Sequence, residues 1–140
     1  MEGRRDLVES LAPLALFSDL TRPELESVAH EFEEEMFAEG QRVIRQGLSG
    51  SNLFVIIEGQ AIVSRDGGEV TRLGPGEIFG EVSVLTGVPP TADVVAGTLL
   101  RCLVIPGPEA ERFLLARPAV MLKMLKTEAR RVHSTYEWRG

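Results

Sequence analysis

A series of short apolar segments, each ended by glycine or another turn residue, fills the middle of this 140-residue chain and limits the folds open to it. Residues 53–57 are the most apolar segment, and residues 61–63 and 70–73 are separated by Asp66-Gly67-Gly68. That tripeptide is typical of a β-hairpin, because glycine adopts positive φ at low steric cost. Further strands are expected at 32–37, 42–45, 91–96 and 99–105. At least seven short strands at near-regular spacing predict a closed antiparallel sandwich or roll.

Helical patterns flank the β-rich segment on both sides. Thr21 and Glu24 have the spacing of a capping box, which predicts a helix of about ten residues ending near His30. After a proline-rich turn, the apolar spacing returns to a helical period over 110–116 and 119–133. We expect one mainly β domain over 1–140, with helices in 1–31, an antiparallel β-roll, jelly-roll-like, in 32–106, and two C-terminal helices in 107–140.

The composition excludes several classes of protein. A hydrophobic fraction of 44% with 26% charged residues is typical of a folded globule, and no apolar run is long enough to span a membrane. Cys102 is the only cysteine, which excludes an intramolecular disulfide and favours a cytoplasmic protein. His30 and His133 lie far apart, so we expect no metal site. No histidine is paired with a nucleophile, and we expect no enzymatic activity.

The net charge of −6 is unevenly distributed along the chain. Residues from Glu111 onward sum to +4, whereas everything before them sums to −10. A basic helix is typical either of a solvated surface or of a site for an acidic partner. Because the acidic remainder would repel phosphates, we expect no direct binding of nucleic acid.

Residues 74–85 carry the strongest signal for a binding site. Gly74, Gly76 and Gly80 interrupt the strand pattern, and a short helical turn is predicted at 81–85, packed inside the wall of the roll. The first amides of a helix have no acceptor within it and form a natural cradle for an anion. Two simpler interpretations stay open: Gly80 is only a turn glycine, and Glu81 only caps its helix.

The order of these pieces resembles the cyclic nucleotide-binding domain of bacterial transcription regulators, cyclic nucleotide-dependent kinases and gated channels. The resemblance covers about residues 12–130 and implies a β-roll with flanking helices and a phosphate-binding cassette at 79–92. The matching pieces are residues 14–17, Glu39-Gly40, Arg45-Gln46-Gly47, residues 53–56 with Glu58-Gly59, residues 73–76, and residues 79–92.

This resemblance implies a role for each candidate ligand-binding residue. The amides at the start of the cassette helix would bind the cyclic phosphate of cAMP or cGMP, and the Glu81 carboxylate would accept from the ribose 2′-hydroxyl. Thr91 has a hydroxyl that donates to an anion or to a base edge, which in the family is associated with guanine, and Ala92 ends the cassette. No other cofactor is implied. The full candidate set is Gly80, Glu81, Val82, Ser83, Thr91 and Ala92.

One residue departs from the family pattern. The cassette normally has an arginine after its proline, and Pro90 stands at that position. Proline has neither a charge nor an N–H, and losing the charge-assisted contact would cost about 2–4 kcal/mol, or roughly 30- to 1000-fold in affinity. Two hypotheses therefore remain: a regulatory module that binds cAMP or cGMP weakly, and a degenerate module that binds another ligand or a protein.

The last helix closes over the base and transmits the signal in the family. Tyr136 and Trp138 near its end would stack on a base, or else pack on the β-roll or on a second subunit. Met121, Met124 and Leu125 are predicted to lie in the core or in a dimer seam. The implied macromolecular partners are thus a second copy of the chain or an output protein.

Overall fold

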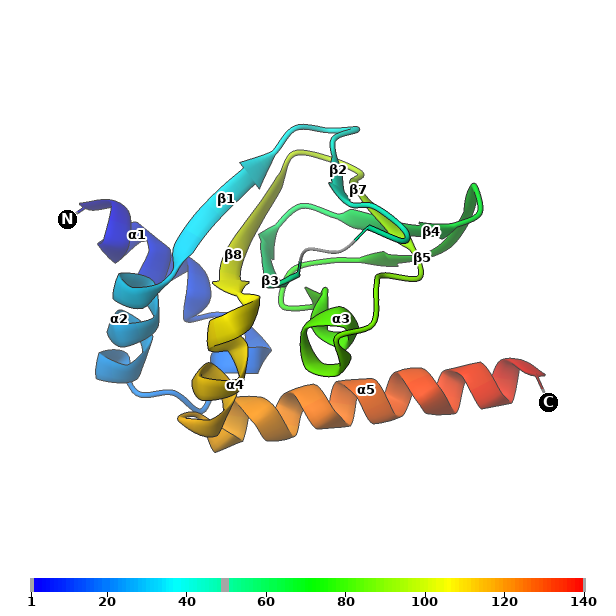
Figure 1. The fold of residues 1–140 in the computed structure, drawn as a ribbon. Coiled ribbons are helices and arrows are strands. Elements are labelled where there is room, and N and C mark those ends of the chain that lie inside the picture. The colour runs from blue at the N-terminus through cyan, green and yellow to red at the C-terminus, as the bar shows by residue number, and fades with distance from the viewer. Residues whose placement is uncertain (1, 49–50, 140) are drawn as a thin grey trace.

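The computed structural model describes residues 2–48 and 51–139, with side chains for residues 6–48 and 51–133. Two four-stranded antiparallel sheets form its centre (Figure 1). The first has the order β1 (Glu33–Phe37), β8 (Leu100–Pro106), β3 (Asn52–Glu58), β6 (Ile78–Phe79). The second has the order β2 (Arg42–Ile44), β7 (Asp93–Ala96), β4 (Ala61–Arg65), β5 (Gly68–Leu73).

The mainly antiparallel β architecture with flanking helices is confirmed, but the expected closure is wrong. Among the described residues the two sheets share no ladder of hydrogen bonds. The strands β1 and β2 are consecutive, yet β1 pairs with β8 and β2 with β7, so the chain changes sheet in the turn between them. The strand β6 is only two residues long because a helix follows it directly, and it forms no bridge to the second sheet. The predicted hairpin is present as β4 and β5.

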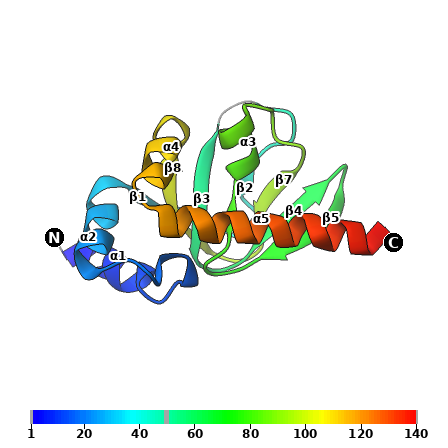
Figure 2. The same ribbon diagram turned by 90° about the horizontal axis from the view of Figure 1, so that it is seen from below.

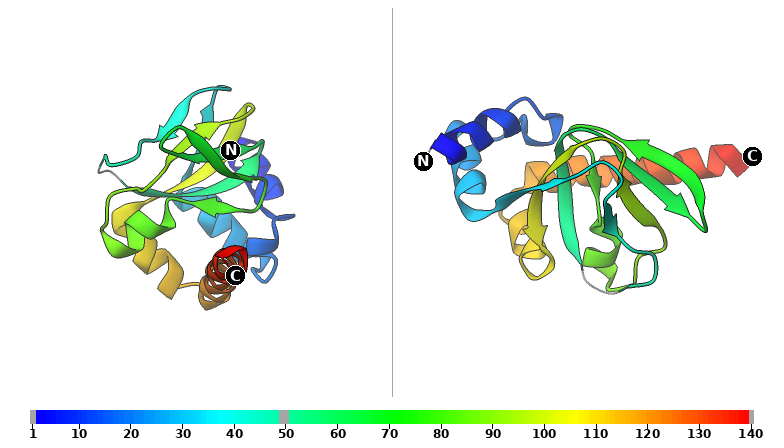
Figure 3. Two further views of the ribbon diagram at one scale, coloured as in Figure 1. Left: turned by 90° about the vertical axis from the view of Figure 1, so that its right-hand side faces the viewer. Right: turned by 90° about the horizontal axis from the view of Figure 1, so that it is seen from above.

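Helices pack at one end of the sheets and beneath them (Figures 1 and 3). Before the strands come α1 (Glu2–Leu11), the 3₁₀ helix η1 (Ala15–Phe17) and α2 (Arg22–Glu31), and after them α4 (Gly107–Leu115) and α5 (Pro118–Arg139). The capping box of α2 is confirmed, since Thr21 and Glu24 each accept from the other's amide. The helix α5 is longer than predicted, whereas β7 begins at Asp93 rather than at Thr91. Within the described residues no helix is both long and apolar enough to cross a membrane.

The apolar residues of α5 divide between two faces. Val120 and Met124 are buried in the core formed by the helices and the first sheet, so α5 docks on the domain through them. Met121, Leu125 and Val132 are exposed by 38%, 64% and 55%. The core position predicted for Met124 is confirmed, whereas the core does not cover Met121 or Leu125, which lie next to the buried positions on the helix surface.

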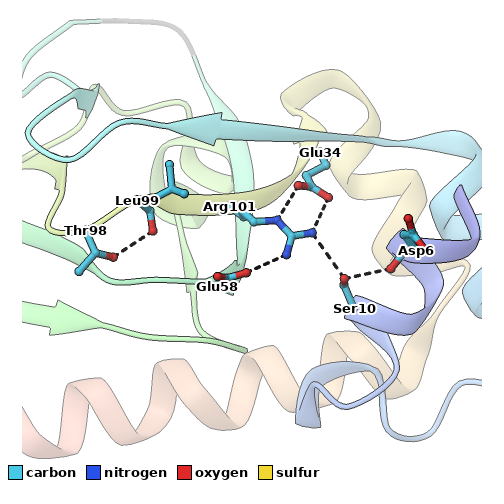
Figure 4. Close-up of polar contacts among 7 residues, drawn as sticks. All are labelled: Asp6, Ser10, Glu34, Glu58, Thr98, Leu99 and Arg101. Atoms are coloured by element: carbon cyan, nitrogen blue, oxygen red, sulfur yellow. Dashed lines mark hydrogen bonds and ion pairs between the residues drawn. The ribbon is translucent and has the colours of Figure 1, made fainter. Parts of the chain in front are cut away.

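Arg101 of β8 joins three strands and the first helix (Figure 4). Its Nε and Nη2 donate to the two carboxylate oxygens of Glu34 at 2.7 and 2.9 Å, and its Nη1 donates to Glu58 at 2.8 Å. Its Nη2 also lies 3.5 Å from the hydroxyl of Ser10, which in turn donates to the Asp6 carbonyl. The hydrogen bonds to Glu34, and then to Glu58, raise the pKa of Arg101 above its ordinary value.

Replacing Arg101 with methionine is expected to lower the free energy of unfolding by about 1–2 kcal/mol, because Glu34, only 24% exposed, then lacks its partner. Urea denaturation measures the loss. The matched control is Arg112→Met, since the Arg112 side chain is 71% exposed and its one ion pair among the described residues is with Glu109. We expect the control to change stability by less than about 0.5 kcal/mol. Equal losses in the two variants would contradict a structural role for the Arg101 contacts.

Candidate functional site

A glycine sets the start of the helix α3 (Glu81–Thr86), which interrupts the strand pattern as predicted. Gly80 has φ +85°, and a Cβ there would lie 2.3 Å from the carbonyl oxygen of Asn52. Any other residue would be strained and would push α3 away from β3. The first helical hydrogen bond runs from the amide of Val84 to the carbonyl of Gly80 at 3.2 Å. The amides of the three residues between them thus have no acceptor in the helix.

These amides border a cavity of about 250 Å³ between α3 and the second sheet. The structure brings all six predicted ligand-binding residues to this cavity, although they come from two segments of the chain. Its apolar walls come from both sheets, with Phe79 from the first and Ile44, Leu73 and Val94 from the second, and Asn52 and Arg131 also line it. These wall residues were not predictable from the sequence, because each is an ordinary member of its strand or helix.

Glu81 is a buried carboxylate at the centre of this arrangement, with an exposed fraction of 7%. Burial raises its pKa, and the nearby charge of Glu128 raises it further, whereas Arg131 acts in the opposite direction. The Nη1 of Arg131 lies 3.3 Å from Glu81 and 3.1 Å from Glu128, and its Nη2 donates to the carbonyl of Ile78 at 3.0 Å. Glu81 therefore does more than cap its own helix, because its carboxylate also contacts Arg131 of α5.

The raised pKa predicts how stability depends on pH. Because the pKa of Glu81 is higher in the folded state than in the unfolded one, its stabilising contribution is complete below the ordinary value of 4.5. It is lost as pH rises through the raised pKa. We expect Glu81→Gln to increase the free energy of unfolding at pH 7, with the gain over the native protein disappearing below about pH 4.5. Urea denaturation between pH 4 and pH 7 measures this difference in the free energy of unfolding, and the exposed Glu39→Gln is the control. An increase that does not depend on pH would contradict the prediction.

The loop after α3 carries no charge where the resemblance implies one. Pro90 lines the cavity, and its carbonyl accepts from the amide of Gly47 at 2.8 Å. Arg65 of β4 reaches the next residue, donating its Nε to the Thr91 carbonyl at 3.1 Å and its Nη2 to the Thr91 hydroxyl at 3.4 Å. The cation that lines the cavity among the described residues is instead Arg131, from a distant helix. Its part was not predictable, since it appeared in the sequence only as one of several basic residues of the last helix. The side chains of Tyr136 and Trp138 lie outside the described residues.

The two sheets and the glycine-started helix define a β-roll module with a cavity beside that helix. Residues 34–117, more than half of the chain, match the sequence model of the cyclic nucleotide-binding domain. The chain belongs to this family, and the resemblance deduced from the glycine pattern is confirmed.

Solved structures share the fold over nearly the whole chain. The regulatory subunit of a cAMP-independent protein kinase A from Trypanosoma brucei matches 99% of this chain and 52% of its own, with a TM-score of 0.80 and 24% identity. A variant of that subunit with three substitutions, one of which introduces an arginine, is bound to cAMP in its A site and matches with a TM-score of 0.79 and 24% identity over the same shares.

Two further structures extend the comparison. The regulatory domain of Toxoplasma gondii protein kinase A with cAMP matches 91% of this chain and 51% of its own, with a TM-score of 0.76 and 23% identity. The catabolite activator protein of Thermus thermophilus matches 86% of this chain and 59% of its own, with a TM-score of 0.74 and 26% identity. The chain thus spans between 51% and 59% of the length of these three proteins.

Proposed function

We propose that this domain is a regulatory module that binds cAMP or cGMP weakly at the cavity beside α3 and passes the occupancy of that cavity to α5. One observation carries the proposal: the first amides of α3, the buried carboxylate of Glu81 and the guanidinium of Arg131 meet at one cavity. A ligand bound there contacts the cassette and the last helix together. In this role the domain binds and signals, and catalyses no reaction of its own.

The chemistry of the cavity suits a cyclic nucleotide. Amide donors at a helix start, in a region of positive helix dipole, stabilise a phosphate. A buried carboxylate accepts strongly from a sugar hydroxyl, since such charge-assisted hydrogen bonds exceed neutral ones in strength. The apolar walls offer a surface for the base.

Signal transmission follows from competition for Glu81. The Nη1 of Arg131, on α5, lies 3.3 Å from this carboxylate. A ribose hydroxyl that takes the same oxygen weakens the contact, and occupancy of the cavity then shifts the equilibrium position of α5. The exposed Met121 and Leu125 of this helix are the proposed contacts for a second copy or an output protein.

A second candidate function is a module that keeps the fold but binds another small ligand or a protein. Pro90 favours it, because the loop beside the cavity then contributes no cation to a phosphate. The similar kinase subunit described as cAMP-independent shows that a natural protein of this fold can operate without cAMP.

Calorimetric titration with cAMP and cGMP at millimolar concentrations separates the two functions. The weak-sensor function predicts saturable binding that Glu81→Ala weakens at least tenfold, because the ribose contact is lost. The exposed Glu39→Ala is the matched control and should bind like the native protein. Absence of binding by the native protein to either nucleotide would contradict the weak-sensor function and favour the second candidate.

A further inference from the structure

A second, larger cavity of about 1420 Å³ lies between β5 and α5, and we refer to it as the β5–α5 groove. Figure 2 shows α5 passing across β4 and β5, and the view along α5 in Figure 3 places the helix beneath the strands. Ala15 and Leu16 of η1 and the following Ser18 line one part of the groove, and Arg65 at the end of β4 lines another. The proposed nucleotide site does not use this groove, although Arg131 borders both cavities.

The strand β5 meets the groove with its free edge. It is the outer strand of its sheet, and among the described residues it pairs only with β4. Residues 69–73 all line the groove. Successive side chains of a strand point to opposite faces, so five consecutive residues border one groove only where the strand edge faces it. Such an edge presents backbone N–H and C=O groups that can pair with another chain.

The middle of this edge also exposes an apolar side chain. The pairing of β4 with β5 shifts register between Val63 and Ser64, which leaves Val70 as the extra residue of a bulge. Val70 is 58% exposed and lies between Glu69 and Thr71. All residues of β5 are exposed except Leu73, which is buried. A bound strand would cover this side chain.

The groove is strongly basic although the chain as a whole is acidic. Among the described residues six basic side chains line it, against the carboxylates of Glu69 and Glu77 only. Three of the six have carboxylate partners: Arg72 pairs with Glu69, Lys123 with Asp19, and Arg131 with Glu81 and Glu128.

Within the part of the chain that the structure describes, the other three basic residues have no carboxylate partner. Arg65 donates to Thr91 and Arg130 to the hydroxyl of Thr127. No carboxylate of the described residues lies within ion-pair distance of Arg65, Lys126 or Arg130. Lys126 and Arg130 are four residues apart on α5, which places them on the same side of the helix.

We propose that the β5–α5 groove binds an acidic peptide segment in an extended conformation, which adds to β5 as a further strand and places its carboxylates against Lys126 and Arg130. The six residues of β5 extend for roughly 20 Å, enough for about six residues of the partner. The free strand edge favours a peptide over a nucleic acid, because strand addition depends on main-chain amides that a nucleic acid lacks. The inference is independent of whether the cassette binds a nucleotide.

The test uses a fluorescent eight-residue peptide in which glutamate alternates with valine or threonine, titrated against the whole protein at low salt. We expect saturable binding, weakening as salt rises, with hydrogen-exchange protection of the β5 amides. The double variant Lys126→Glu/Arg130→Glu should bind at least tenfold more weakly, because both side chains are exposed and their reversal repels the peptide. The matched control Arg42→Glu/Arg112→Glu changes the net charge equally outside the groove and should bind like the native protein.

Two further ligands distinguish strand addition from simple attraction between charges. The same peptide with an N-methyl group at every residue keeps its charge, but both of its strand edges are blocked and it cannot form a ladder. We expect it to bind at least tenfold more weakly. A single-stranded oligothymidine carries phosphates but no strand-forming backbone, and it should also bind more weakly. Equal binding of the N-methylated peptide or of the oligothymidine would overturn the proposal, and so would equal weakening by the two double variants.

Discussion

Replacing Pro90 with arginine is expected to tighten binding of cAMP and cGMP by roughly 30- to 1000-fold, equivalent to about 2–4 kcal/mol. Pro90 lines the cavity close to the start of α3, and the native loop contributes no positive charge there. A guanidinium at this position would form a charge-assisted contact with a phosphate already oriented by the α3 amides.

Calorimetry measures the affinity for cAMP and cGMP in the native protein, in Pro90→Arg and in the control Val88→Arg. Val88 belongs to the same loop, but its side chain is 50% exposed and does not line the cavity, so an arginine there adds only distant charge. The gain from Pro90→Arg should shrink when Glu81→Ala is added, because both residues hold the same ligand. An equal gain from Val88→Arg, or no gain from Pro90→Arg, would contradict a phosphate site at this position.

Replacing Met124 with glutamate is expected to cost about 3 kcal/mol or more in the free energy of unfolding. Met124 is 4% exposed and packs into the core formed by the helices and the first sheet, so the substitution buries a charge and removes apolar contacts. The loss should detach α5 from the domain, and with it the contact of Arg131 with Glu81.

The neighbouring residue supplies the control for this prediction. Leu125 is 64% exposed on the same helix, and Leu125→Glu should change stability by less than about 0.5 kcal/mol. Urea denaturation gives the free energies, and sedimentation shows whether Leu125→Glu alters self-association. Similar small effects in both variants would show that α5 does not dock through the Met124 face.

The local structure of this fold was predictable where a residue type strongly favours one backbone conformation or one capping position. Gly80 with its positive φ, the hairpin around Gly67 and the capping box of Thr21 and Glu24 all lie where the sequence indicated. Each depends on neighbours within a few residues. The family resemblance depended on the same glycine pattern. The six candidate residues that it implied all line one cavity.

The long-range features were not predictable from local pattern. The chain changes sheets between β1 and β2, and no local signal separates that turn from a hairpin. The spacing of Met121, Met124 and Leu125 fits one helical stripe, but the core covers only Met124 among them. The contact between Arg131 and Glu81 links residues 50 positions apart in the sequence. It depends on how α5 is oriented after α4.

The most direct test of the central claim is a ¹H–¹⁵N NMR titration of the native protein with cAMP and cGMP at millimolar concentrations. If the cavity beside α3 is the nucleotide site, saturable shifts should appear first at the amides of residues 80–83, 91 and 92. The guanidinium signal of Arg131 should move with them as its contact with Glu81 weakens. Shifts confined to the β5–α5 groove, or unchanged cassette amides at saturating nucleotide, would contradict the claim that this cavity binds a cyclic nucleotide.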